Sequence, residues 1–82
     1  MDQVFKKKKL TLKQGDTIYI GLVSSKILAS VKAVVDDNVV IEIVDYDNNG
    51  YRVGTGKELK IFGYSNYDIL KLPPQTNPIW NT

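Results

Sequence analysis

The chain has 82 residues, which is room for one domain, and its hydrophobic fraction of 43% is ordinary for a globular protein. It contains no cysteine and no histidine, which excludes disulfides, the usual structural zinc sites and the common catalytic triads. The net charge of +2 excludes a strong overall field, although lysines gather near the start of the chain and acids gather in its middle.

Residues 1–13 are predicted to form a basic arm or a first strand. Residues 6–9 are four consecutive lysines, and Leu10 and Leu12 would face the interior if residues 4–12 are extended. The lysine run is not followed by an apolar stretch of about 7–15 residues, so it is not the pattern of a signal peptide. No apolar run approaches the length that spans a membrane. We therefore expect a cytoplasmic chain with no membrane contact.

Residues 14–72 alternate apolar and polar side chains, which is the pattern of short strands with one buried face. We expect strands at residues 17–23, 26–35, 39–46, 58–62 and 67–72. The apolar side chains that should share the buried face of the first three strands are Ile18, Ile20, Leu22, Ile27, Ala29, Val31, Ala33, Val35, Val39, Ile41 and Ile43. Later in the chain, Leu59 and Ile61 share one face, and Asp68, Leu70 and Leu72 lie opposite Ile69 and Lys71.

Turn-forming residues separate these strands. Residues 36–38 predict a tight hairpin, and residues 48–50 predict a second one with a type I′ turn, because Asn and Gly tolerate positive φ. Gly54 and Gly56 indicate a bend or bulge. Such short connections predict an antiparallel meander, and a meander this small must curl to bury one face. The expected fold is therefore all-β, a meander closed into an SH3-like or split β-barrel of five or six strands.

Residues 73–82 differ in kind from the rest. Three prolines exclude a helix or a central strand there, so this segment is predicted to be an extended tail or a linker that ends near Trp80.

No catalytic or metal-binding pattern is complete. Residues 45–50 match the first half of a calcium loop, but Arg52 and Gly56 stand where that loop needs an aliphatic residue and a bidentate Glu. Asp36 and Asp37 are adjacent on a turn, where both should be solvated and ordinarily ionised. We expect no catalytic residue, no metal and no cofactor, and interpret the chain as a non-enzymatic protein.

Binding is the function class that remains, and our first interpretation is a module that contacts a protein partner or its own copies. Exposed aromatic side chains make good anchors for such contacts. The candidate contact residues are Tyr19, Tyr46, Tyr51, Phe62, Tyr64 and Trp80.

The alternative is a small barrel that binds nucleic acid. Lysines would contact phosphates and surface tyrosines would stack on bases. The candidate lysines are Lys6, Lys7, Lys8, Lys9 and Lys13. A third interpretation is a regulatory domain detached from a longer chain.

Overall fold

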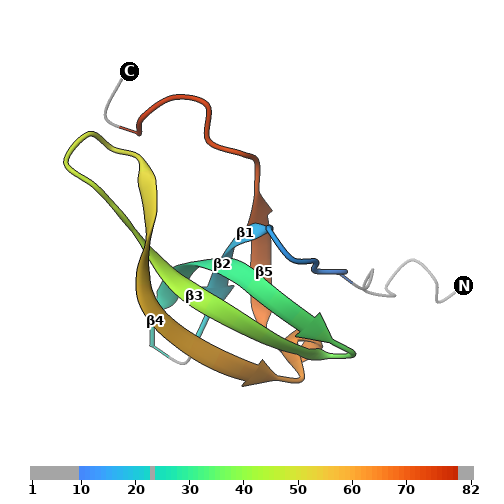
Figure 1. The fold of residues 1–82 in the computed structure, drawn as a ribbon. Coiled ribbons are helices and arrows are strands. Elements are labelled where there is room, and N and C mark those ends of the chain that lie inside the picture. Colours follow the sequence, from blue (N-terminus) through green and yellow to red (C-terminus); the bar gives the residue numbers. More distant parts are fainter. Residues whose placement is uncertain (1–9, 23, 80–82) are drawn as a thin grey trace, which may run out of the picture.

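The computed structural model describes residues 10–22 and 24–79, and in it five strands form one antiparallel sheet (Figure 1). The strands are β1 (Thr17–Gly21), β2 (Lys26–Val35), β3 (Asn38–Tyr46), β4 (Arg52–Phe62) and β5 (Asp68–Leu72). Their spatial order is β4-β3-β2-β1-β5, so the last strand returns to pair with the first. The all-β prediction is confirmed. The sheet is not closed into a barrel, since β4 and β5 are its two edges.

The core lies on one face of this sheet. Alternation places Ile18, Ile20 and Ile41 there with no exposed surface, as the sequence predicts. In Figure 1, β1 and β5 run at a steep angle to β3 and β4, so the sheet bends around the buried face. The remaining buried members of the core are Leu12, Ala29, Val31, Val39, Ile61 and Tyr64.

A bulge in β2 reverses the predicted alternation. Val31 is opposite Ile41 but Ala33 is opposite Val40, so β2 advances two residues while β3 advances one. One extra residue turns every following side chain to the other face. The prediction that Ala33 and Val35 face the core is therefore wrong, because Val34 packs against the core and Val35 is 65% exposed.

A second irregularity lies in β4. Glu42 is opposite Glu58 and Val44 is opposite Gly54, so β4 advances four residues while β3 advances two. The bend or bulge predicted from Gly54 and Gly56 is thus confirmed, but it lies inside a strand that begins at Arg52, six residues before the predicted start. β1 in turn ends at Gly21, short of the predicted limit.

Both predicted hairpins are present, but the second differs in type. The Asp47 N–H donates to the Tyr51 carbonyl (2.9 Å) and the Gly50 N–H donates to the Asp47 carbonyl (3.0 Å). Of residues 48–50 only Gly50 has a positive φ, 86°. Residues 48–50 therefore form a three-residue hairpin loop and not a type I′ turn, which needs a positive φ at both of its central residues. The physical reason is Asp47, whose Oδ1 accepts the N–H groups of Asn49 and Tyr51.

The 3-10 helix η2 (Tyr64–Asn66) connects the two edge strands and covers the core. Its Tyr64 N–H donates to the Asp37 carbonyl (2.8 Å), and the Ser65 hydroxyl donates to the Asp37 carboxylate (2.7 Å). Tyr64 is only 4% exposed, and its hydroxyl accepts the Leu12 N–H at 3.3 Å. Tyr64, expected at a contact surface, is therefore a core residue that links η2 to the segment before β1.

The sixth strand expected within residues 4–12 lies mostly outside the described residues, and residues 10–12 are not in a strand. Within residues 10–22 and 24–79, no helix has the length and apolar character needed to cross a bilayer.

Candidate functional site

The predicted aromatic contact residues do not form one site. Phe62 is opposite Asn38 at the start of β3, whereas Tyr46 ends that strand. At the rise of an extended strand, these two positions are about 26 Å apart. Tyr51 follows the hairpin loop at the Tyr46 end and is 44% exposed. Trp80 lies outside the described residues.

Tyr19 and Tyr46 do come together. Their side chains are hydrogen-bonded to one another, and this bond raises the pKa of Tyr19, burial acts in the same direction, and the nearby Arg52 opposes both. Both rings are half-buried. Tyr19 also lines an open groove of about 490 Å³ with Lys26, Asp68, Ile69 and Leu70. The groove carries one cationic and one anionic side chain, so its charge favours neither kind of ligand.

Residues 73–79 dock on the hairpin between β3 and β4 of their own chain (Figure 1). The Gln75 side chain accepts the Arg52 N–H and donates to the Gly50 carbonyl, each at 2.8 Å. The Ile79 N–H donates to the same carbonyl (2.8 Å), and Arg52 Nη1 donates to the Pro73 carbonyl (2.9 Å). This part of the predicted tail or linker is therefore attached to the domain.

Among the exposed large apolar side chains, the two with the highest exposed fractions, Phe62 and Val35, lie at the opposite end of the sheet, on the face away from the core. Val35, Asn38 and Phe62 are neighbours across β2, β3 and β4, and Ala33, Val40 and Lys60 form the next row. Phe62 is 71% exposed and Val35 is 65% exposed, and a shallow hollow of about 70 Å³ lies between these rows. We call Ala33, Val35, Val40 and Phe62 the apolar end patch.

Sequence reasoning found Phe62 but missed Val35. The alternation before Val35 is regular and predicts that this side chain faces inward. Only the bulge brings it beside Phe62, and nothing in the local sequence marks a bulge at Lys32.

The apolar end patch borders an exposed edge strand. All residues of β4 from Val53 to Lys60 are exposed, and Leu59, on the core side of the sheet, is 37% exposed. Glu58 and Lys60 lie on the other face of β4 and have no ion-pair partner among the described residues. Among the described residues, the strand therefore presents backbone groups that no other strand pairs with, together with two charged side chains of opposite sign.

Among the candidate lysines, only Lys13 is described. Its backbone N–H donates to Asp16 Oδ2 (2.9 Å), and the same carboxylate pairs with Lys71 at 3.3 Å. Burial raises the pKa of Asp16, but the bond from Lys13 and the pairing with Lys71 lower it by more, so the net shift is downward. An ionised acid thus lies beside Lys13. Lys6, Lys7, Lys8 and Lys9 fall outside the described residues.

Residues 45–50, which partly match a calcium loop, belong to the hairpin described above. In the described part of the chain, no group of three or more Asp, Glu, His or Cys side chains is placed to hold a metal ion.

No protein-family model, no curated protein and no solved structure matches this chain.

Proposed function

We propose that this chain is a non-enzymatic binding module that contacts a protein partner, or its own copies, through the apolar end patch and the adjoining edge of β4. The observation that carries the proposal is the exposure of Val35 and Phe62 in one row at the end of the sheet. Contiguous apolar side chains on a soluble surface mark contact sites, and a buried aromatic ring is a frequent anchor of such contacts.

We further propose that the fold is an SH3-like small barrel left open between β4 and β5. The strand order β4-β3-β2-β1-β5, the short hairpins and the 3-10 helix before the last strand support this assignment. The opening leaves β4 free to contact another chain.

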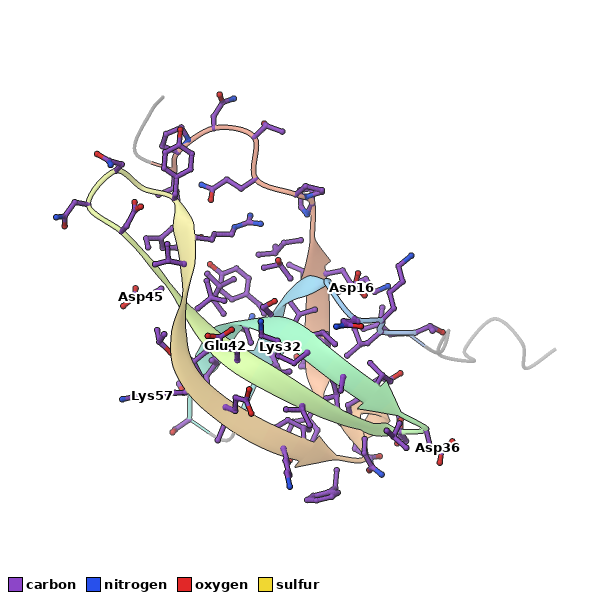
Figure 2. All side chains as sticks on the ribbon, viewed as in Figure 1. Asp16, Lys32, Asp36, Glu42, Asp45 and Lys57 are labelled. Atoms are coloured by element: carbon purple, nitrogen blue, oxygen red, sulfur yellow. The ribbon has the colours of Figure 1, made fainter. Side chains whose placement is uncertain are left out.

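A protein partner suits this surface better than a nucleic acid does. Asp36 and Asp37 form the turn next to Val35, and Glu58 lies on the same face of the sheet as Phe62 (Asp36 is labelled in Figure 2). These three carboxylates outnumber the one lysine beside the apolar end patch, Lys60, so the surface would repel a phosphate backbone.

A substitution at Phe62 tests the proposed surface. The native chain and Phe62→Ser are each immobilised and incubated with a cell extract. We expect the variant to bind about tenfold less of any protein that binds the native chain specifically. Leu70→Ser is the matched control, because Leu70 is 61% exposed on the other edge strand. Neither change should lower the free energy of unfolding by more than about 0.5 kcal/mol. Equal capture by Phe62→Ser and native chains would contradict the proposal.

Chromatography on immobilised single-stranded DNA separates the two partner classes. Retention that collapses as salt rises, and that Phe62→Ser leaves unchanged, would support the nucleic-acid alternative instead.

A further inference from the structure

The second half of β4 is a regular, exposed edge strand. Residues 58–62 pair with residues 38–42 without a register shift, so this stretch is a regular strand. It lies at the edge of the sheet, where no strand of the described residues pairs with alternate backbone N–H and C=O groups. Its exposed side chains include one apolar residue on the core side, Leu59, and Glu58 and Lys60 on the other face.

We infer that β4 pairs antiparallel with β4 of a second copy of this chain, about a two-fold axis that passes at Leu59. This inference rests on the proposed function and names a second copy as the partner. The two copies would then share one continuous ten-stranded sheet, five strands from each.

The charges on the strand select this register. Residues opposite one another in a sheet point to the same face, so a two-fold axis normal to the sheet must pass at a residue and not between two. An axis at Glu58 would oppose Glu58 to its own copy, and an axis at Lys60 would oppose Lys60 to its own copy. An axis at Leu59 instead opposes Glu58 to Lys60 twice, and opposite charges in that position stabilise a ladder.

The same register also matches the apolar side chains. Leu59 lies opposite the second copy's Leu59 on the core side, so two half-exposed apolar side chains cover one another. The ladder ends before Phe62, because the residue that would face it, Gly56 of the second copy, lies in the bulge, has a φ of 85° and donates its N–H to Glu42.

The proposed interface is small, so a high protein concentration is needed to detect the dimer. The ladder joins about five residues from each copy, well below a standard protein interface, so we expect a dissociation constant in the micromolar range or weaker. Sedimentation equilibrium of the full chain, at concentrations up to about 1 mM, should therefore show a monomer–dimer equilibrium.

Charge exchange tests the register. In the Glu58→Lys dimer, two lysines face one another at both cross-strand positions, and in the Lys60→Glu dimer two glutamates do. The dissociation constant of each variant homodimer should therefore be about tenfold higher than that of the native dimer. An equimolar mixture of the two variants restores both opposite-charge pairs and should form a heterodimer with native affinity. The double variant E58K/K60E should again form a homodimer. Circular dichroism of each variant checks that the sheet is retained.

Three results would overturn the inference. The first is a native chain that stays monomeric at about 1 mM. The second is the formation of assemblies larger than a dimer, because a two-fold contact joins only two copies. The third is a mixture of the single variants that associates no better than either variant alone. The proposed function is judged separately, because Phe62-dependent capture of a different protein would support it even where the native chain is monomeric.

Discussion

At the residue scale, the Glu42 carboxylate joins three strands. It pairs with Lys32 of β2 (3.0 Å), and its Oε2 accepts the Gly56 N–H from the bulge of β4 (2.8 Å; Figure 2 shows Lys32 and Glu42 together). A Cβ at Gly54 would collide with this carboxylate, so the backbone of β4 approaches it closely. Together with the Thr55 hydroxyl, which donates to the Ile43 carbonyl (2.8 Å), the Glu42 side chain holds the irregular part of the edge strand in place.

The ionisation of Glu42 should make stability depend on pH. The hydrogen bond from Lys32, and then the one from Gly56, lower the pKa of Glu42 below its usual value of 4.5. A lowered pKa in the folded state means that the stabilisation is present above the unfolded value and is lost as pH falls through the folded value.

We therefore expect the native chain to melt at a higher temperature than Glu42→Gln near about pH 7, and the two midpoints to converge as pH falls below about 4.5. Glutamine can still accept the Gly56 N–H, so the difference in melting temperature between the two proteins reports the negative charge of Glu42 alone. Asp16 also has a lowered pKa, but it is present in both proteins and cancels in the comparison. A midpoint difference that is independent of pH from about 3 to 7 would show that the Lys32 pairing does not contribute.

At the element scale, the bulge in β2 exchanges the roles of two adjacent valines. Val34 packs against the core, and Val35 joins the apolar end patch. Because the same strand carries both, the bulge links the packing of the core to the composition of the candidate contact surface.

A matched pair of substitutions tests the bulge. Val34→Ala should lower the free energy of unfolding by about 1–2 kcal/mol, because it removes methyl groups packed on the core. Val35→Ala should change it by less than about 0.5 kcal/mol, because that side chain is in water. Urea unfolding of both variants gives the two values, and the opposite ranking would mean that β2 alternates without interruption.

The patterns in individual strands show how far the sequence could predict the elements. Alternation identified the core faces of β1 and β3, because the period of two follows from the extended backbone itself. It could not place the start of β4, since Gly54 and Gly56 read as a turn when taken alone. Their position inside a strand depends on the side chain of Glu42 from the neighbouring strand.

At the scale of the whole molecule, the segment after β5 returns to the far hairpin and ties two distant parts of the chain together. Gln75 is the centre of this contact, since it satisfies one donor and one acceptor of the hairpin backbone. β5 itself is held by its pairing with β1, by the ion pair between Lys71 and Asp16 (3.3 Å) and by the packing of Ile69 on the core, so the Gln75 contact fixes the segment that follows it.

Removing the Gln75 amide should loosen this attachment. We expect Gln75→Ala to lower the free energy of unfolding by about 1–2 kcal/mol, because the part-buried Arg52 N–H loses its acceptor. Amide hydrogen exchange should speed up at Arg52 and at Ile79. Thr76→Ala is the control, because Thr76 is exposed and no hydrogen bond of its side chain is found among the described residues. Unchanged exchange at Arg52 in Gln75→Ala would contradict the role assigned to the amide.

The residue types and their alternation by themselves determined that this chain is all-β, that Ile18, Val31 and Ile41 are buried, and that no cysteine or histidine chemistry is available. Those conclusions depend only on composition and on the local geometry of an extended backbone. The tertiary structure decided that Val35 joins Phe62 on the surface, that Tyr64 enters the core and that Gln75 binds the far hairpin. Each of these depends on how segments far apart in the chain meet, which a local pattern does not encode.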